Sequence, residues 1–185
     1  MSGVIGTSPN MKSGVLGQYP AGHVIGHTNK TVNDASSIGT SQTSAQDSGI
    51  YIVHTAKDSS SNSYMEFNFS CGMGYQQSDN AQANIDICLT SPSSTTYSDA
   101  NSILKATHSY PWFKMARHID EYEAYSVRAA CGLDTGMGVS GNKGTWVAGD
   151  ELHFRIFYWS SSGEWRLVHQ DACYVVTVTE IMRNT

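Results

Sequence analysis

Apolar and polar residues alternate along several stretches of the chain, which is the pattern of half-buried antiparallel strands. In the clearest stretch, residues 64–71, one face carries Met65, Phe67, Phe69 and Cys71. Residues 84–89 repeat the pattern, with one face expected to point inward and the other outward. The expected inward residues are Ile85, Ile87 and Leu89, and the expected outward residues are Asn84, Asp86 and Cys88. Each stretch therefore predicts one strand.

The C-terminal half of the chain predicts further strands. Residues 125–131 alternate again, and in residues 152–158 one face carries Leu152, Phe154, Ile156 and Tyr158. A turn is expected at residues 160–163, followed by a returning strand at residues 165–168 and a β-branched closing strand at residues 174–182. Strands separated by polar turns, with little helix, indicate a mainly β protein built as an antiparallel β-sandwich.

Residues 109–125 do not fit this alternation. Trp112, Met115, Ile119 and Tyr122 recur at the spacing of one helical stripe, and Pro111 would suit a first helical turn. A short helix and an ordered loop both remain open for this stretch. Its aromatic residues form a possible surface for contact with a receptor: Tyr110, Trp112, Phe113 and Tyr122.

The first thirty residues contain a short repeat that cannot build a core. Residues 2–9 and 13–20 both read Ser-Gly-Val-aliphatic-Gly-x-x-Pro. Glycine frees the backbone and proline restricts it, so both disfavour helix. We expect an extended arm whose apolar side chains dock on another protein, although a frayed terminus is the alternative. The docking residues would be Val4, Ile5, Val15, Leu16, Tyr19 and Pro20.

The predicted domain organisation follows from these patterns. Residues 1–30 form the arm, and residues 31–48 are small and polar, typical of a linker or an edge region. Residues 49–185 form the β-sandwich, which begins with the apolar run 49–55. A chain of 185 residues fits one such domain together with its arm.

Composition and charge exclude several classes of protein. Charged residues make up 15 % of the chain, and the net charge of −5 gives no basic surface for nucleic acid. No apolar run approaches the length of about 20 residues that spans a bilayer, and we expect neither membrane insertion nor a signal peptide. The four cysteines are widely spaced. We therefore expect free thiols in a protein made in a reducing cytoplasm.

No stretch predicts catalysis or a cofactor. Residues 136–141 match G-x-G-x-x-G but lead into another loop, whereas a nucleotide site needs a strand before this motif and a helix after it. No serine, histidine and aspartate can be assigned to a triad from sequence. His23 and His27 would share one face of an extended strand. Exposed polar histidines are commoner than metal ligands, and we predict no metal.

Three segments resemble known structural proteins. Residues 13–25 resemble the start of small virion proteins of tailed bacteriophages, of the tail-fibre and head-decoration types, and residues 174–182 resemble their last strand. Residues 148–152, Ala-Gly-Asp-Glu-Leu, resemble the corresponding turn of trimeric TNF-like jelly rolls. The resemblance covers the arm and roughly the last forty residues, at moderate motif specificity. It implies a jelly-roll-like homotrimer attached to a virion by its arm.

The expected function is therefore a non-enzymatic one. The chain would be a phage virion structural protein, made in the cytoplasm of the host bacterium, that docks on another virion protein. A fibre-like protein and a capsid decoration protein remain open, as does contact with a host surface glycan. The alternative is a glycan-binding lectin-like domain or a glycoside hydrolase. Exposed tryptophans and tyrosines converging in a groove would favour the lectin, and two carboxylates in a cleft would favour the hydrolase.

Overall fold

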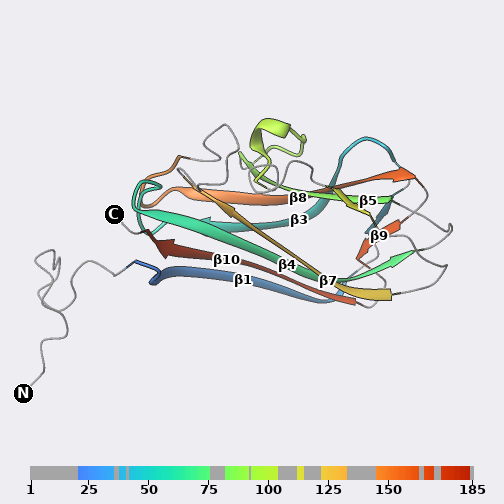
Figure 1. Ribbon diagram of the computed structural model, residues 1–185, viewed down its shortest axis with the longest axis horizontal. Coiled ribbons are helices and arrows are strands. Elements are labelled where there is room, and N and C mark those ends of the chain that lie inside the picture. Colours follow the sequence, from blue (N-terminus) through green and yellow to red (C-terminus); the bar gives the residue numbers. More distant parts are fainter. Residues whose placement is uncertain are drawn as a thin grey trace, which may run out of the picture.

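The protein is a sandwich of two antiparallel sheets (Figure 1). The computed structural model describes residues 21–35, 38–40, 42–75, 82–91, 93–103, 112–114, 122–132, 145–162, 165–168 and 172–183. The predicted mainly β, antiparallel sandwich is confirmed. In the described part of the chain the one helical segment is a single 3₁₀ turn, η1 (Asp99–Asn101).

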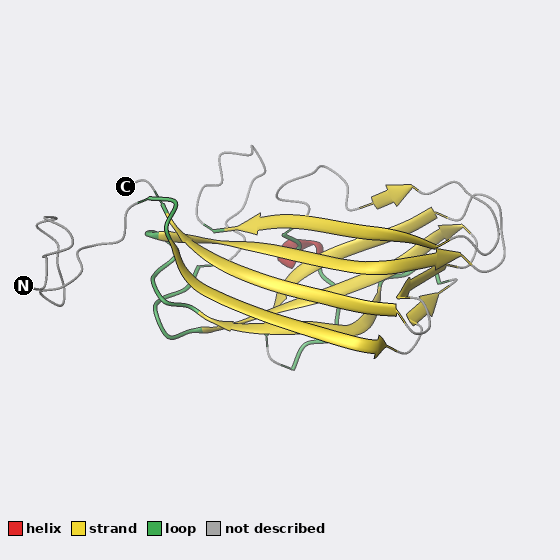
Figure 2. Ribbon diagram, turned by 90° about the horizontal axis from the view of Figure 1, so that it is seen from below, coloured by secondary structure: helices red, strands yellow, loops and turns green. Residues whose placement is uncertain are grey.

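The larger sheet has six strands, and its long strands run side by side along the length of the domain (Figure 2). They are β1 (Val24–Ala35), β10 (Ala172–Met182), β4 (Ser63–Tyr75), β7 (Tyr122–Cys131), β9 (Trp165–Val168) and β2 (Ile38–Thr40). The four-stranded sheet contains β3 (Gln46–Thr55), β8 (Glu151–Ser162), β5 (Gln82–Thr90) and β6 (Trp112–Lys114).

Eight of the strands pair in a nested order. The first pairs with the last, β1 with β10, and inside this pair lie β3 with β8, β4 with β7, and β5 with β6, all antiparallel. The pairs β10–β4 and β8–β5 then join them into sheets ordered β1-β10-β4-β7 and β3-β8-β5-β6. Two packed sheets of eight strands with this connectivity form a jelly roll. The short strands β2 and β9 pair with each other, and β9 also pairs with the end of β4.

The core lies between the sheets, and the predicted alternation places it correctly. On β4 the side chains of Met65, Phe67 and Phe69 are fully buried, while the residues between them are half-buried on the outer face. On β8 the predicted face, from Leu152 to Tyr158, is also buried. The rings of Phe67 and Phe154 meet across the sandwich at 5.8 Å between centroids. The inward faces of β4 and β8 therefore supply the centre of the core.

The expected outward face of β5 is in fact buried. Asn84, Asp86 and Cys88 are as inaccessible as the inward residues Ile85 and Ile87. The loop that follows β5 folds back over this face, where the hydroxyls of Ser102 and Tyr97 donate to Asp86. The amide of Ile103 also donates to the carbonyl of Ile87 at 2.8 Å. Alternation on its own therefore predicts the core-facing side of this strand but misses the covering loop.

The structure also differs from the expected boundaries. β1 pairs with β10 over Val24–Ala35, so the end of the predicted arm belongs to the larger sheet. Residues 31–35, at the start of the predicted linker or edge region, belong to this edge strand as well. β8 continues through Ser162, where the turn at residues 160–163 was expected.

The glycine of the Ala-Gly-Asp turn before β8, Gly149, has a φ of 97°, which suits a residue without a Cβ.

The described parts of residues 109–125 are strands, so the helix is not formed there. Trp112–Lys114 is β6, which pairs with β5, and the stretch from Tyr122 onward is β7, which pairs with β4. Edge pairing satisfies the backbone in both places, and this outweighs the weak helical spacing of four apolar residues. Residues 109–111 and 115–121 lie outside the described residues.

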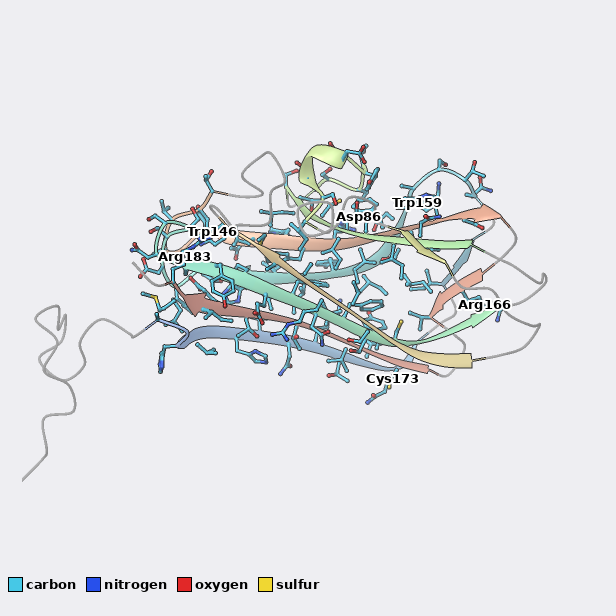
Figure 3. All side chains as sticks on the ribbon, viewed as in Figure 1. Asp86, Trp146, Trp159, Arg166, Cys173 and Arg183 are labelled. Carbon is cyan, nitrogen blue, oxygen red and sulfur yellow. The ribbon has the colours of Figure 1, made fainter. Side chains whose placement is uncertain are left out.

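All four cysteines are free, as expected. Cys71, Cys88 and Cys131 are buried, and Cys173 is exposed on the outer side of the larger sheet (Figure 3). Cys71 lies opposite Tyr174 in the register of β4 and β10, so its neighbour Cys173 points to the other face of the sheet. Among the residues that the structure describes, no helix is long and apolar enough to cross a membrane.

Candidate functional site at the N-terminal end of the sandwich

The segment that precedes β1 is tied to the end of β10. The amide of Gly22 donates to the carbonyl of Met182 at 2.8 Å, and the amide of Met182 donates to the carbonyl of His23 at 2.9 Å. Gly22 has a φ of 77°, so the chain turns here in a conformation that glycine adopts without strain. We call residues 21–23 the arm root. The predicted docking residues from Val4 to Pro20 lie outside the described residues.

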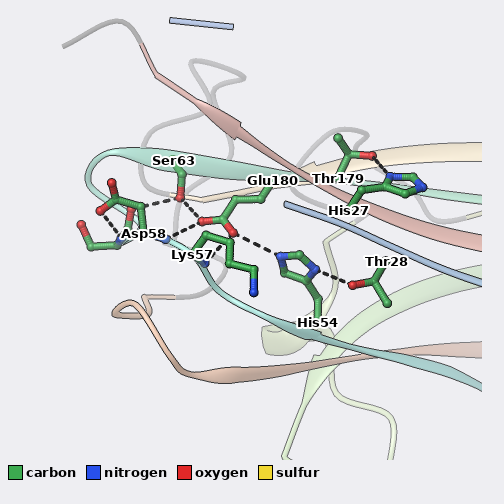
Figure 4. Close-up of polar contacts among 9 residues, drawn as sticks. His27, Thr28, His54, Lys57, Asp58, Ser63, Thr179 and Glu180 are labelled. Carbon is green, nitrogen blue, oxygen red and sulfur yellow. Dashed lines mark hydrogen bonds and ion pairs between the residues drawn. The ribbon is translucent and has the colours of Figure 1, made fainter. Parts of the chain in front are cut away.

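A buried carboxylate lies two residues before the arm root's partner on β10. Glu180 is fully buried and receives four hydrogen bonds (Figure 4). The donors are the amides of Lys57 at 2.7 Å and Asp58 at 2.9 Å, the Ser63 hydroxyl at 2.8 Å and His54 Nε2 at 3.2 Å. We call these five residues the Glu180 cluster. It joins β10 to the end of β3, the loop after it and the start of β4.

The four donors decide the charge of the buried carboxyl. Burial on its own would raise the pKa of Glu180, because the charged form loses its hydration. The hydrogen bonds from His54, the two backbone amides and Ser63 outweigh this, so the pKa lies below its ordinary value. Glu180 is therefore an anion at neutral pH, and the cluster is a built anionic centre inside the sandwich.

His54 connects the cluster to β1. Its Nδ1 lies 2.9 Å from the Thr28 hydroxyl, so both ring nitrogens have a partner. Gly26 makes this approach possible, because a Cβ at this position would lie 2.9 Å from His54 Cε1. The register of β1 against β10 shifts between Val24 and Gly26, so this irregularity of the strand lies beside the histidine. The cluster therefore ties the edge strand of the larger sheet to the edge strand of the smaller one.

Neighbouring loops close the same end of the domain. The side chains of Trp146 and Arg183 both lie there (Figure 3). The amide of Ser60 donates to the carbonyl of Trp146 at 3.0 Å, and the amide of Arg183 donates to the carbonyl of Asn62 at 2.8 Å. Arg183 Nε also donates to the carbonyl of Ser63 at 2.9 Å. The loop between β3 and β4 is thus held from several sides.

A second buried carboxylate, Asp86, lies on the outer face of the four-stranded sheet. It accepts the Ser102 hydroxyl at 2.6 Å and lies 2.9 Å from the Tyr97 hydroxyl. Tyr97 also contacts Asp99 at 2.6 Å and packs against the ring of Trp159. Burial, followed by the bonds to the two carboxylates, raises the pKa of Tyr97, which therefore keeps its proton. This arrangement fastens the loop after β5 and leaves Asp86 inaccessible to a substrate.

Tyr51 is the aromatic residue among the large apolar side chains that are exposed in the described part. Lys30 Nζ lies 4.7 Å from its ring centroid and the Arg155 guanidinium lies 5.0 Å from it. Arg155 also pairs with Asp47 at 2.6 Å. Tyr51 is thus held between two cations at the side of the sandwich, which is a packing role.

The outer face of the larger sheet is polar. Ser70, Ser126 and Asn68 form a chain of hydrogen bonds across β4 and β7, and Arg128 pairs with Glu66 beside them. On β1 and β10, His27 Nδ1 lies 3.1 Å from the Thr179 hydroxyl (Figure 4). Within the described ranges, no group of three or more histidine, cysteine, aspartate or glutamate side chains could hold a metal ion.

The aromatic residues predicted to contact a receptor do not share one strand. Trp112 and Phe113 lie on β6, the last strand of the four-stranded sheet, while Tyr122 begins β7 in the larger sheet. Tyr110 lies outside the described residues. The proposed receptor contact stays a prediction.

Sequence reasoning missed the Glu180 cluster, although a signal for it was present. Tyr174, Val176 and Val178 occupy the inward face of β10, and the next position on that face is Glu180. On β3, Ile50 and Ile52 are followed in the same way by His54. A titratable residue that continues an inward apolar series indicates a buried polar pair.

The comparisons with known proteins give only remote similarity. No family model and no curated protein matches the chain. Among solved structures it is similar to the VP2 subviral particle of infectious bursal disease virus, with a TM-score of 0.33 and 11% identity over 97% of this chain and 45% of that chain.

Two other particles from the same virus give comparable values. The T=1 particles give a TM-score of 0.36 and 10% identity, over 97% of this chain and 44% of that chain. The T13 viral particle gives 0.28 and 11%, over 97% of this chain and 43% of that chain. The chain spans less than half the length of each of these proteins, and no functional inference follows from them.

Proposed function

We propose that this chain is a non-enzymatic structural protein of a virion, docked to another virion protein by its N-terminal arm. The observation that carries the proposal is the nested pairing of eight strands, from β1 with β10 inward to β5 with β6. This jelly-roll connectivity recurs in viral capsid proteins. Because one fold hosts many functions, the assignment needs support from the arm as well, both from its composition and from the end of the domain at which it leaves the sandwich.

The arm supports it through composition and position. Residues 2–9 and 13–20 carry apolar side chains between glycines and prolines and cannot build a core of their own. The arm root leaves the sandwich at the C-terminal end of β10, tied there by two backbone hydrogen bonds. A docking segment that leaves a closed domain at one end can reach a neighbouring protein while the sandwich remains folded.

The finer part of the proposal follows from the sequence resemblance. The particle would be that of a tailed bacteriophage, assembled in the bacterial cytoplasm, and the sandwich would form a homotrimer that can contact the host surface. A fibre-like role and a capsid decoration role both use the same arm.

The proposal is tested by deleting residues 2–20, which leaves the arm root and its bonds to Met182 in place. The deleted protein should keep the melting temperature of the full chain but fail to load onto particles that lack it. The double substitution Ile5→Asp with Leu16→Asp should do the same, because two carboxylates would have to be desolvated on docking. Normal loading of the folded, truncated protein would contradict docking through the arm.

A further inference from the structure

The Glu180 carboxylate is surrounded by donors alone. The amides of Lys57 and Asp58, the Ser63 hydroxyl and His54 Nε2 all point at its two oxygens. A carboxylate anion accepts all of these bonds, whereas a neutral carboxyl carries a proton on one oxygen and turns one acceptor into a donor. The two backbone amides cannot reverse their roles, whereas the Ser63 hydroxyl can also donate to the Ser59 carbonyl, which lies 3.1 Å away. Protonation of Glu180 therefore weakens the bonds from the Lys57 and Asp58 amides, because hydrogen bonds to a charged acceptor are about twice as strong as those to a neutral one.

We propose that the Glu180 cluster is a proton-sensitive latch that holds the β3–β4 loop and the arm root against the sandwich and releases them in acid. The loop is held directly, through Lys57 and Asp58. The arm root is held through β10, because Met182, two residues after Glu180, makes both backbone bonds to it. The edge strand β1 is held through Thr28 and His54.

The other groups that face Glu180 do not set this behaviour. His54 has a partner at both ring nitrogens, since the Thr28 hydroxyl can donate to Nδ1 or accept from it. From the loop, Lys57 and Asp58 contribute backbone amides, and Asp58 Oδ1 is turned to Ser59 and Asn62. The residues of β1 over the cluster, Gly26 and Thr28, do not titrate. After β10, Arg183 is directed at the Ser63 carbonyl.

The direction of the pH dependence follows from the lowered pKa of Glu180. A carboxyl whose pKa is lower in the folded state stabilises the fold above its unfolded value of about 4.3. That contribution is lost as the pH falls through the lower, folded-state value. The latch therefore stays closed at neutral and mildly acidic pH and opens only below the range in which exposed carboxyls titrate.

The direct test is an NMR titration of the full chain from pH 7 downward. The amide proton shifts of Lys57 and Asp58 should follow one curve, with a midpoint below that of exposed carboxyls. The amides of Val176 and Val178, in the middle of β10, should keep their shifts and protection through the same range. Unchanged shifts of Lys57 and Asp58 while the domain stays folded would overturn the proposal. A transition of all four amides at one pH would also overturn it, because the latch would then not open separately.

Two serine variants of the same loop region sharpen the test. Ser63→Ala removes one donor to Glu180 and should raise the midpoint of the titration toward the ordinary carboxyl range. Ser61→Ala is the matched control, because the Ser61 hydroxyl contacts Ser59 and not Glu180, and it should leave the midpoint unchanged. Equal midpoints in both variants and the parent chain would contradict the role of the four donors.

A glutamine variant tests the charge itself. Glu180→Gln should lower the exchange protection of the Lys57 and Asp58 amides at pH 7 at least tenfold, because the amide group carries two hydrogens among donors. Glu66→Gln is the control, since Glu66 lies on the outer face and pairs with Arg128. If the glutamine variant does not fold, the titration of the parent chain and of Ser63→Ala still decides the matter. Full protection of both amides in a folded Glu180→Gln protein would overturn the latch.

Discussion

The side chain of Phe67 shows how the core of this protein is held at the scale of single residues. It lies on the inward face of β4, is fully buried and meets Phe154 of the opposite sheet. Interiors are packed as densely as organic crystals, so the removal of such a ring leaves a cavity that the neighbours only partly fill. The removal of this ring should therefore destabilise the sandwich.

Phe67→Ala should lower the free energy of unfolding by about 3–5 kcal/mol, from lost burial and the cavity together. Thr177→Ala is the control, because Thr177 occupies a half-buried position on the outer face of β10 and should cost about 1 kcal/mol or less. Urea denaturation of both variants measures the two values. Similar losses in the two proteins would contradict the assignment of inward and outward faces.

The cysteines provide a second prediction at the residue scale. Burial, with a smaller contribution from nearby Cys173, raises the pKa of Cys71 to about 12, and burial raises the pKa of Cys131 to about 12. Because the thiolate is the reactive form, both should be inert in the folded protein, while exposed Cys173 should react first with iodoacetamide. Mass spectrometry should find all four labelled after denaturation without reductant. Rapid labelling of Cys71 in the native protein, or a protected pair after denaturation, would contradict this.

At the scale of elements, the sequence predicts the positions of the strands well. It predicts poorly which loops cover the outer faces of those strands. Period-two alternation identified β4, β7 and β8 because the core lies on one side of each strand, and β-branched residues identified β10. The burial of Asp86 could not be predicted in this way, since it depends on a loop that folds back over β5 through Tyr97 and Ser102. Side-chain bonds between a strand and a later loop leave no periodic signal.

The loop after β5 should loosen when the Tyr97 hydroxyl is removed. Tyr97→Phe keeps the ring contacts with Phe157 and Trp159 but removes a donor near buried Asp86, which should cost about 1–3 kcal/mol. Hydrogen exchange of the Ile103 amide, which bonds to Ile87, reports the loop directly and should accelerate.

Tyr51→Phe is the control for this experiment, because Tyr51 is half exposed on β3 and does not contact the loop through any bond among the described residues. Its Ile103 amide should exchange at the parent rate. An unchanged Ile103 amide in Tyr97→Phe would show that the ring contacts, and not the hydroxyl, hold the loop.

The N-terminal region contains a strand that could not be predicted from the sequence. The polar residues of β1 give no strand signal, so the sequence places its first part in the arm and the rest in a linker or edge region. β1 forms a strand because its backbone pairs with the edge of β10, and because Gly26, which has no Cβ, can lie against His54. The two residues at the centre of the candidate site, His54 and Glu180, stand 126 positions apart, and only the fold brings them together.

At the scale of the whole molecule, the nested pairing brings the first and last strands of the sandwich together. β1 and β10 are the first and last strands and lie side by side, so the arm root and the C-terminal end of β10 meet at one end of the domain (Figure 1). Alternation along the sequence could not predict this pairing, because partner strands are chosen by tertiary packing, and only the resemblance to jelly rolls implied it.

Oligomeric state belongs to this scale as well. We expect the full chain to form a trimer, as the resemblance of residues 148–152 to trimeric jelly rolls implies. Light scattering at micromolar concentration should give three times the chain mass, and the chain without residues 2–20 should give the same ratio, because association is assigned to the sandwich. A monomer in both experiments would contradict trimerisation.

If this chain is a jelly-roll component of a virion, a density map of the intact particle must contain it. The map should show a sandwich with sheets ordered β1-β10-β4-β7 and β3-β8-β5-β6 on the particle surface. From the arm root beside Met182, continuous density should lead to a different virion protein, with side chains of Val4, Ile5, Val15 and Leu16 buried against it. Purified, infectious particles that contain no such density, and no copy of the chain by mass spectrometry, would contradict it.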